Sequence, residues 1–299
     1  MVKYKRNDKF RLKVTDRCSF SCPFCHAEGG KHVKDIVISS DLYKAVELLR
    51  PLYSRVHITG GEPFLYDKLD NIMDILENYG YKMTVTTNGY FSLHEKQKTI
   101  ERMEYINFSV HSFQKQYVAN LTGRNDAAKY FIPVILQNIK ILNQILPVKI
   151  NTVVSDNQEG QRLEEIFEFC EHLNIELKLV PEWSVRDKAS LIIKDILAKN
   201  GFNLYEKIYL LPGSNVRERY KNSREQIIEV KNIEFYFPDF LCKNCTKKEY
   251  CQEGFSFLRL GGEPLYFQPC IYNKKVGLEE FRETMLPNIY SMFEKVGIL

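Results

Sequence analysis

The stretch FRLKVTDRCSFSCPFC at residues 10–25 decides how this chain folds. It begins with an apolar, β-branched run typical of a strand. Directly after it come Cys18, Cys22 and Cys25, spaced Cys-x3-Cys-x2-Cys. Three thiolates on one loop suit three irons of a [4Fe–4S] cluster, whose fourth iron then has no protein ligand. A zinc site with His26 as the fourth ligand is the alternative, and the spacing favours iron–sulfur.

Further strand-like runs follow this stretch, separated by segments with helical spacing of apolar residues. Strands are predicted at 10–15, 55–59, 82–87, 105–110, 148–154 and 175–180, and helices at 39–53, 68–80, 127–146 and 160–174. This alternation indicates parallel βαβ units, arranged as a partial (β/α)6 barrel or as a doubly wound sheet. After about residue 181 the alternation gives way to helical pieces and a cysteine-rich segment. We therefore predict a core domain at 1–220 and an appended domain at 221–299.

In either α/β arrangement, ligands bind at the carboxyl ends of the strands. Cys18, Gly60, Asn88, His111 and Val154 all follow or end predicted strands, so we expect them at one rim. The glycines lie in HITGGEP at 57–63, where they let a backbone approach a ligand closely. The Glu62 carboxylate of this motif is placed to accept hydrogen bonds from an ammonium group. A simple strand-ending turn is the alternative, and the cysteine loop one βα unit upstream argues against it.

Composition excludes several classes of protein. The chain has 299 residues, 44% of them hydrophobic, and a net charge of only +4, so nucleic-acid binding is not expected. The N-terminus lacks the apolar region of a secretory signal, and no apolar run is long enough to span a membrane. We expect a cytoplasmic protein, where eight cysteines indicate metal or redox chemistry rather than disulfides.

Taken together, the motifs resemble the radical S-adenosylmethionine superfamily, and within it most closely the GTP 3′,8-cyclase family of molybdenum-cofactor synthesis. The resemblance covers about residues 8–185 and rests on RLKVTDRCSFSCPFC, HITGGEP, VTTNG, NFSVHS, LTGRND, VKINTVV and IELKLV. It implies a partial (β/α)6 TIM-like barrel with a cluster on Cys18, Cys22 and Cys25. S-Adenosylmethionine would be chelated at the open iron and cleaved reductively to a 5′-deoxyadenosyl radical that abstracts hydrogen from the substrate.

The resemblance also implies roles for individual residues. The positions expected to bind S-adenosylmethionine are Phe24, Gly60, Gly61, Glu62, Pro63, Asn88, Ser109 and Trp183. Arg11, Thr86 and Lys149 match positions that contact the substrate, although Arg11 and Lys149 also suit plain salt-bridged strand residues. His57 and His111 are candidate catalytic residues, as substrate contacts or proton donors at strand ends. A lone histidine is more often structural.

A second cysteine group, Cys242, Cys245, Cys251 and Cys270, has the spacing Cys-x2-Cys-x5-Cys-x18-Cys. The spacing fits a structural zinc or an auxiliary [4Fe–4S] cluster; the resemblance favours the latter, giving two clusters. The cyclases use three cysteines here, so four would close the cluster unless Cys251, the extra one by position, is not a ligand. A second Gly-Gly-Glu-Pro, at 261–264, separates two strand-like runs and predicts a hairpin turn. Cys170, in a helical segment, is expected to be a buried apolar residue.

Three departures from the cyclases bear on the substrate. His57 replaces an arginine, the paired arginines after the second auxiliary cysteine are absent, and the chain ends in KVGIL rather than Gly-Gly. We therefore predict radical chemistry on a nucleotide or other small molecule, leading to cyclisation, rearrangement or oxidation, but not true GTP cyclisation. A peptide-modifying radical enzyme and a non-catalytic iron–sulfur or zinc scaffold are the alternatives. An electron donor such as flavodoxin or ferredoxin is the expected protein partner.

Overall fold

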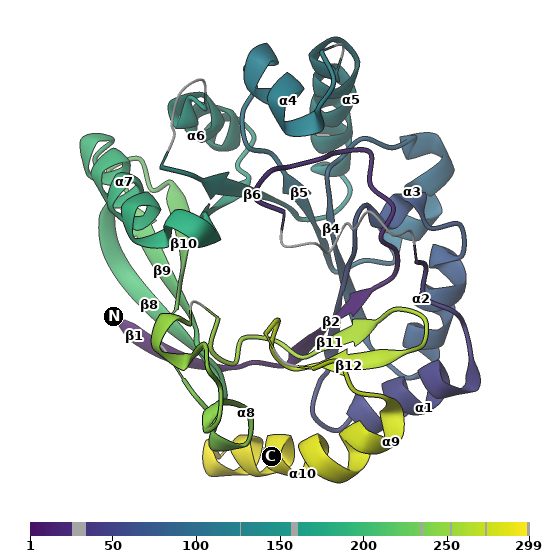
Figure 1. The fold of residues 1–299 in the computed structure, drawn as a ribbon. Coiled ribbons are helices and arrows are strands. Elements are labelled where there is room, and N and C mark those ends of the chain that lie inside the picture. Colours follow the sequence, from purple (N-terminus) through teal and green to yellow (C-terminus); the bar gives the residue numbers. More distant parts are fainter. Residues whose placement is uncertain are drawn as a thin grey trace.

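The computed structural model describes residues 1–25, 34–125, 127–156, 161–233, 236–251, 253–272 and 274–297. Within these residues, twelve strands form one sheet in the order β1-β8-β9-β10-β7-β6-β5-β4-β3-β2-β11-β12. The sheet curls around a central space, and most of the helices lie outside it (Figure 1). The molecule is therefore an α/β barrel whose strands differ in direction from one part of the wall to another.

Six parallel strands form one continuous part of the wall, and each pairs with its neighbour in chain order. They are β2 (Lys9–Lys13), β3 (Arg55–Thr59), β4 (Lys82–Thr87), β5 (Tyr105–Ser109), β6 (Val148–Val154) and β7 (Glu176–Pro181). The connecting helices are α1 (Ser40–Leu49), η1 (Pro63–Leu65), α2 (Leu69–Asn78), α3 (Leu93–Glu101), α4 (Lys115–Thr122), α5 (Ala127–Leu142) and α6 (Leu163–His172). The six predicted strands and the partial (β/α)6 barrel are confirmed. Helix α3 escaped prediction because it buries only Thr99 and Ile100 and so has almost no apolar period.

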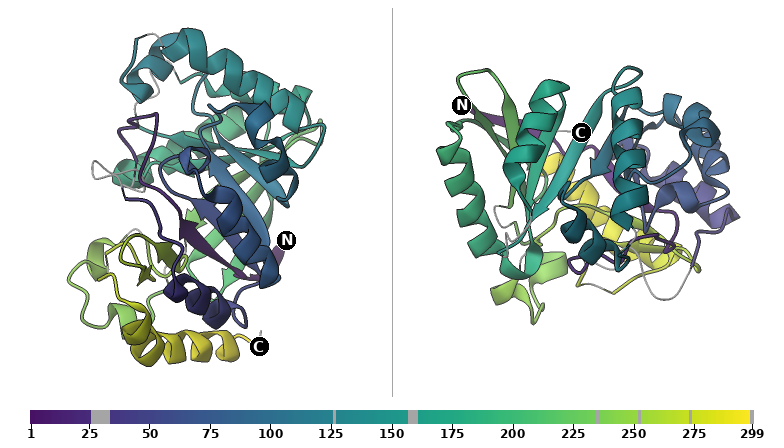
Figure 2. Two further views of the ribbon diagram at one scale, coloured as in Figure 1. Left: turned by 90° about the vertical axis from the view of Figure 1, so that its right-hand side faces the viewer. Right: turned by 90° about the horizontal axis from the view of Figure 1, so that it is seen from above.

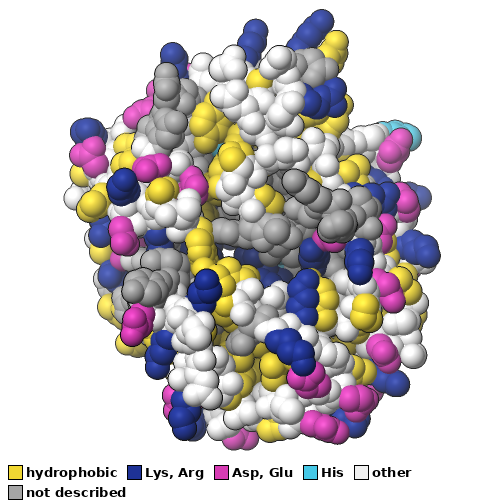
Figure 3. Space-filling model, viewed as in Figure 1, with side chains coloured by type: hydrophobic (Ala, Val, Ile, Leu, Met, Phe, Trp, Pro, Cys, Tyr) yellow, Lys and Arg dark blue, Asp and Glu magenta, His cyan; other side chains and the backbone are white. Residues whose placement is uncertain are grey.

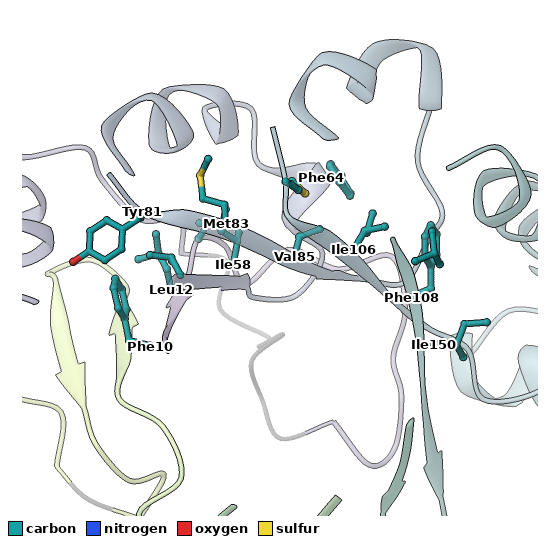
Figure 4. Close-up of a cluster of buried hydrophobic side chains, with 14 of the residues drawn as sticks. Phe10, Leu12, Ile58, Phe64, Tyr81, Met83, Val85, Ile106, Phe108 and Ile150 are labelled. Atoms are coloured by element: carbon teal, nitrogen blue, oxygen red, sulfur yellow. The ribbon is translucent and has the colours of Figure 1, made fainter. Parts of the chain in front are cut away.

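The pleat of these strands separates an apolar outer face from a polar inner one. In β2, Phe10 and Leu12 are fully buried towards the helices, whereas Lys9, Arg11 and Lys13 line the central space. Figure 4 shows the apolar layer between the sheet and the helices, with Ile58, Val85, Ile106, Phe108 and Ile150 among its members. Burying each such side chain stabilises the fold by about 1.5–3 kcal/mol. The hydrophobic core thus surrounds the barrel, and its interior is left for polar groups.

The wall continues beyond β7 with antiparallel strands that the sequence did not reveal. After η2 (Trp183–Val185) and α7 (Arg186–Lys199), a meander of β8 (Asn203–Leu211), β9 (Asn215–Lys221) and β10 (Ile227–Ile233) pairs with β7 through β10. The prediction of helical pieces was right for α7 and wrong for this meander. In β9 the charged residues Arg217, Glu218 and Arg219 are consecutive, which breaks the apolar/polar alternation by which a strand is recognised.

The N-terminal segment joins the two parts of the wall. Strand β1 (Val2–Arg6) pairs in parallel with β8 at one edge of the sheet and continues after two residues into β2. At this crossing the backbone N–H of Asn7 donates to the carbonyl of Leu211 at 2.7 Å. The Asn7 side chain donates to the carbonyls of Pro212 and Ser256. The chain itself therefore connects the edge of the sheet beside β8 to β2.

The cysteine-rich segment adds to the same sheet on the other side of β2. It contains α8 (Asp239–Cys242), η3 (Lys248–Tyr250), β11 (Arg259–Gly261), β12 (Tyr266–Gln268), α9 (Leu278–Glu280), η4 (Phe281–Met285) and α10 (Leu286–Lys295). Strands β11 and β12 form the predicted hairpin, with Gly262 at φ +80° in the turn, and β11 pairs in parallel with β2. Helix α10 lies on the outer side of the barrel wall (Figure 2). The ring of Phe293, in this helix, meets that of Tyr53 at 5.6 Å. Among the helices in the described part of the chain, none has the length and apolar character to cross a membrane.

Candidate active site

The barrel encloses a cavity of about 570 Å³. Among the residues singled out from the sequence, those that line it are Arg11, Cys18, Cys22, Phe24, Cys25, His57, Gly60, Gly61, Thr86, Asn88, Ser109, His111, Lys149 and Trp183. Figure 3 shows the face of the molecule that is seen in Figure 1. This face is hollowed near its centre, and Lys and Arg side chains lie beside the hollow. Residues spread over more than 170 positions of sequence thus converge on one space. Glu62, Pro63 and the second cysteine group do not line this cavity.

The first cysteine group lies on an irregular segment after β2, above the carboxyl ends of the strands. The three thiols are close enough to influence one another. Burial, and then the neighbouring Cys18 and Cys25 thiols, raise the pKa of Cys22 to about 12. The backbone N–H of Phe20 donates to the Cys18 sulfur at 3.4 Å, and the Asn88 amide lies 4.0 Å from it. Burial also raises the pKa of Cys18. Thiols that resist ionisation, with donors directed at one sulfur, fit a group that brings its own positive charge.

Those thiols need not converge on a single point to hold a cluster. In the described residues, no three His, Cys, Asp or Glu side chains are grouped so as to hold one metal ion. The cysteines of a [4Fe–4S] cluster bind different irons. The donor set of Cys18, Cys22 and Cys25 therefore fits a cubane with one iron left for a small-molecule ligand.

The two glycines after β3 allow close approach to the base of the cysteine loop. The N–H of Gly61 donates to the carbonyl of Thr15 at 2.8 Å, and that of Glu62 donates to the carbonyl of Arg17 at 2.7 Å. A Cβ on Gly61 would lie 2.2 Å from the Arg17 oxygen, and one on Gly60 would lie 2.4 Å from the Thr15 oxygen. The glycines are thus required by the chain's own backbone, which fixes the start of the cysteine loop against β3.

Glu62 is wholly buried and bonded within the protein. Its Oε1 accepts from the Phe64 N–H at 3.1 Å and from the Thr87 hydroxyl at 2.8 Å, and its Oε2 accepts from the Asn88 N–H at 2.7 Å. Burial raises the pKa of Glu62 to about 7. The sequence placed this carboxylate against the cofactor's ammonium group; in the structure its described partners are the backbone and side chains of TTNG and of η1.

Of the two histidines predicted at strand ends, His111 follows the end of β5 as expected, and His57 does not lie at the end of its strand. His57 lies in the middle of β3, not at its end, between the hydroxyls of Thr86 at 2.8 Å and Thr84 at 3.2 Å. Burial, and then the nearby cations beginning with Arg11 and Lys9, hold the pKa of His57 well below its usual value. It is therefore a neutral hydrogen-bonding group rather than a positive charge.

His111 follows β5 and lies against Phe24 of the first cysteine loop. Its Nδ1 accepts from the N–H of Val153 at 3.0 Å, and burial lowers its pKa to about 4. The ring of Phe24 meets the His111 ring edge-on, with centroids 4.8 Å apart. Trp183, the first residue of η2, donates from its indole to the Tyr272 hydroxyl at 3.2 Å. Tyr272 lies two residues after Cys270, so this contact links the rim to the second cysteine group.

The second cysteine group gathers four thiols from separate short elements. The pKa of Cys242 is raised to about 11, first by burial and then by Cys270, Cys251 and Cys245. The Cys251 sulfur accepts from the N–H groups of Glu253 and Gly254, and the Cys270 sulfur accepts from the Tyr272 N–H. Cys251 thus belongs to the group and carries the hydrogen bonds that a sulfur ligand receives. It also lines a separate outer cavity of about 590 Å³ against α7.

The central cavity is strongly cationic. Among the described residues, the Lys and Arg side chains lining it are Lys9, Arg11, Lys13, Lys149, Lys178, Arg186, Arg217, Lys231, Arg259 and Lys275, and the carboxylates are Glu176, Glu182, Glu229 and Glu253. The sequence identified only two of these ten cations. The alternation of charged residues in β2 was the available signal. The cations of β9, β10 and β11 reach the cavity through pairing between strands that are distant in sequence.

Burial, and then neighbouring charges, shift the pKa values of the charged groups in this cavity. Burial, followed by Arg11, lowers the pKa of Lys231 to about 7. Burial also lowers the pKa of Lys178, although its ammonium lies 2.9 Å from Glu229. Burial opposes ionisation of Glu229, yet Lys178 and Arg217 outweigh it and bring that pKa to about 2. A cavity in which lysines bind protons less readily is one that an anion would stabilise.

Comparison with known proteins agrees with this geometry. The sequence profile of the Radical SAM superfamily matches residues 12–170, just over half of the chain. The GTP 3′,8-cyclase of Nautilia profundicola is 26% identical over 301 residues, covering 93% of this chain and 87% of that protein. The GTP 3′,8-cyclase of Helicobacter pylori is 25% identical, covering 83% and 78%. Streptococcus suis SuiB bound to S-adenosylmethionine has a similar fold, with a TM-score of 0.60 at 16% identity, covering 97% of this chain and 68% of that one.

The family match spans the cysteine loop, the Gly-Gly-Glu-Pro motif and strands β3 to β6 of the cavity wall. Members of this family use a [4Fe–4S] cluster and S-adenosylmethionine, and the donor set of the first cysteine group suits that cluster. On this evidence the chain belongs to the radical SAM superfamily.

Proposed function

We propose that this protein is a radical SAM enzyme whose substrate is a polyanionic small molecule of the nucleotide class. The observation that carries the proposal is the excess of cations in the central cavity, where ten Lys and Arg side chains face four carboxylates among the described residues. Buried cations without enough counter-charges raise the free energy of an empty site, and a bound polyanion relieves it. Nucleoside triphosphates bring the required charge.

The two ends of the cavity would bind different molecules, the cofactor at the rim and the substrate deeper inside. Cys18, Cys22 and Cys25 would hold the cluster at the rim, beside Gly60, Gly61 and Phe24. When bound, the reduced cluster and S-adenosylmethionine supply a 5′-deoxyadenosyl radical that takes a hydrogen atom from the substrate. Phe24, braced by His111, would pack against the cofactor. Ser109 and Trp183 would also contact it, and Asn88 and Glu62 would hold the loop that binds it.

The substrate would lie deeper, among the inward-facing residues of the strands. Arg11 stands over the ring of Phe257 at 4.9 Å, and Lys149 bonds both oxygens of Glu176 at 3.0 Å. Together with Thr86 and the other cations, they would bind phosphate groups. His57 would contribute a neutral hydrogen bond where a cyclase arginine contributes charge. For that reason the proposal covers the class of substrate, and GTP 3′,8-cyclisation, the reaction in the relatives' name, is not part of it.

The second cysteine group would hold an auxiliary [4Fe–4S] cluster, since its four thiols and their N–H donors suit one. With every iron ligated by cysteine, this cluster would transfer electrons or support the fold rather than bind substrate. Residues 1–220 would form the radical core and 221–299 the auxiliary-cluster domain. A flavodoxin or ferredoxin would supply the electron.

The test is reductive cleavage in the presence of candidate substrates. Anaerobic protein with both clusters is given dithionite and S-adenosylmethionine, with a nucleoside triphosphate, inorganic triphosphate, a peptide or nothing added. We expect slow release of 5′-deoxyadenosine alone and faster release with a nucleoside triphosphate, with a mass change in the nucleotide. Cys22→Ala should release none. Acceleration by peptide and not by nucleotides would favour a peptide-modifying enzyme, and no cleavage at all would favour a scaffold.

A further inference from the structure

Two cavities of similar size meet at Lys231 and Arg186. The outer cavity, of about 590 Å³, lies between α7 and the outward-facing residues of β9 and β10. The central cavity, of about 570 Å³, lies inside the barrel. Among the described residues, only Lys231 and Arg186 line both. The Lys231 side chain is therefore open to a small molecule from two directions.

Lys231 differs from the other lysines of the central cavity in having no partner. It is half-buried, and no hydrogen bond, ion pair or ring contact joins its ammonium group to another side chain in the described part of the chain. The other lysines that line this cavity are Lys9, Lys13, Lys149, Lys178 and Lys275, and their partners are Tyr105, Asp16, Glu176, Glu229 and the ring of Tyr266. Lys231 is thus the lysine of this wall that is left to engage a ligand.

The surroundings of Lys231 favour its neutral amine form. Burial is the largest cause that lowers its pKa to about 7, and nearby cations add to the effect. The charged groups that face it are the cations Arg11, Lys178, Arg186, Arg217 and Arg259 and the carboxylate of Glu253. A desolvated lysine beside other cations is a nucleophile that attacks carbonyl groups.

The same cations limit which carbonyl compounds would bind. Arg11 and Arg259 are register partners in β2 and β11, and both act on Lys231 electrostatically. Guanidinium groups bind carboxylates and phosphates through paired hydrogen bonds. An aldehyde or 2-oxo acid that carries a carboxylate or phosphate would be held by these groups with its carbonyl carbon left for Lys231. A neutral carbonyl compound lacks this anchor.

We propose that Lys231 forms a Schiff base with a small anionic carbonyl compound at the junction of the two cavities. The Lys231 nitrogen bonds to the carbonyl carbon and gives up two hydrogens, and the carbonyl oxygen leaves with them as water. The product is a C=N double bond, and no oxidant or reductant takes part. This activity goes beyond the proposed function and requires no nucleotide, cluster reduction or S-adenosylmethionine.

The experiment traps the Schiff base by reduction. Anaerobic protein with both clusters is incubated at pH 7.5 with glyoxylate and cyanoborohydride, which delivers a hydride to the imine carbon and leaves a stable carboxymethyl group. Peptide mass spectrometry then locates this group, and we expect it on Lys231. Lys194 and Lys248 line the same outer cavity and are exposed, so they are internal controls. We expect them to react at least roughly tenfold more slowly, because an exposed lysine is almost entirely protonated at this pH.

Two comparisons complete the test. Lys231→Arg keeps the charge and cannot form an imine, so this variant should retain its iron and lose the specific label. Glycolaldehyde is similar in size to glyoxylate but neutral, and it should label Lys231 about tenfold more slowly because it forms no charge-assisted hydrogen bonds to the arginines.

Three results would overturn the inference. No trapped adduct on wild-type protein would exclude the Schiff base, and equal labelling of Lys231, Lys194 and Lys248 would show that Lys231 has no special reactivity. Equal rates with glyoxylate and glycolaldehyde would exclude selection of an anion. All three are read on wild-type protein, so none depends on the folding of a variant. Since no nucleotide is present, these failures would leave the proposed function standing, and a failure of nucleotides to promote S-adenosylmethionine cleavage would leave this inference standing.

Discussion

The backbone N–H of Asn88 donates a hydrogen bond of 2.7 Å to the Oε2 atom of Glu62, joining the ends of β4 and β3. The Thr87 hydroxyl and the Phe64 N–H complete the bonding of this carboxylate. The Gly-Gly-Glu-Pro and TTNG motifs are therefore one structural unit. It sits at the base of the cysteine loop, because the adjoining Gly61 is bonded to the carbonyl of Thr15.

Glu62→Gln should lower both stability and cofactor affinity. The amide replaces one acceptor oxygen with a donor, so at least one buried N–H or hydroxyl loses its partner, at a cost of about 1–3 kcal/mol. Glu263 occupies the same place in the second Gly-Gly-Glu-Pro but is exposed in the β11–β12 turn. Glu263→Gln should stay within about 0.5 kcal/mol of wild type. Urea unfolding and S-adenosylmethionine binding, measured on both variants, check this; equal losses would show that the two motifs are equivalent.

Iron analysis should distinguish the two cysteine groups. We expect about eight irons per chain when the protein is purified without oxygen. Cys18→Ala combined with Cys22→Ala should remove about half, and Cys251→Ala should reduce the other half because its sulfur belongs to the second group. Cys170, buried in α6, serves as the control, and Cys170→Ala should keep all the iron. About four irons with one zinc would contradict an auxiliary iron–sulfur cluster.

Acid should destabilise the protein partly through His111. Burial depresses its pKa to about 4 from the ordinary histidine value of 6.5, so the unfolded chain takes up a proton first as pH falls. Stability from the neutral ring is present above pH 6.5 and is lost between there and pH 4, by about 3 kcal/mol in total. His111→Asn keeps an acceptor for the Val153 N–H and removes this dependence. Unfolding free energies at pH 7.5 and 4.5 should therefore differ less in this variant.

The exposed His94 provides the comparison for that measurement. His94→Asn should retain the wild-type pH dependence. A His111→Asn profile parallel to wild type would mean that other groups, such as His57, carry the whole effect.

Anion binding should depend on the protonation of Lys231. Its pKa is lowered to about 7, so the charged fraction grows as pH falls from 8.5 towards 7. The affinity for inorganic triphosphate should rise over this range, by up to about tenfold per pH unit. Lys231→Met should flatten the profile, whereas a change at the exposed Lys274 should not. Calorimetric titrations at three pH values give the answer, and an unchanged slope in Lys231→Met would exclude Lys231 as the titrating group.

The sequence by itself determined the parallel half of the barrel and the cluster loop. Both depend on local information: the period of apolar residues in β2–β7, and the spacing of Cys18, Cys22 and Cys25. Parallel strands connected by helices place their carboxyl ends on one side, so the rim followed from chain order alone. The β11–β12 hairpin could also be predicted from local sequence, because its turn and flanking strands are adjacent in the chain.

Only the tertiary structure decided what the barrel encloses. Alternation in β2 shows that Lys9, Arg11 and Lys13 share a face, but it does not tell what lies opposite that face. Arg217 and Arg259 reach the same cavity from strands more than 200 residues later, through the meander and the β11 pairing that no local pattern signals. Likewise, HITGGEP predicts a carboxylate at a strand end, whereas its direction depends on donors supplied by β4. Charge in a cavity is a property of converging strands, and convergence is set by long-range pairing.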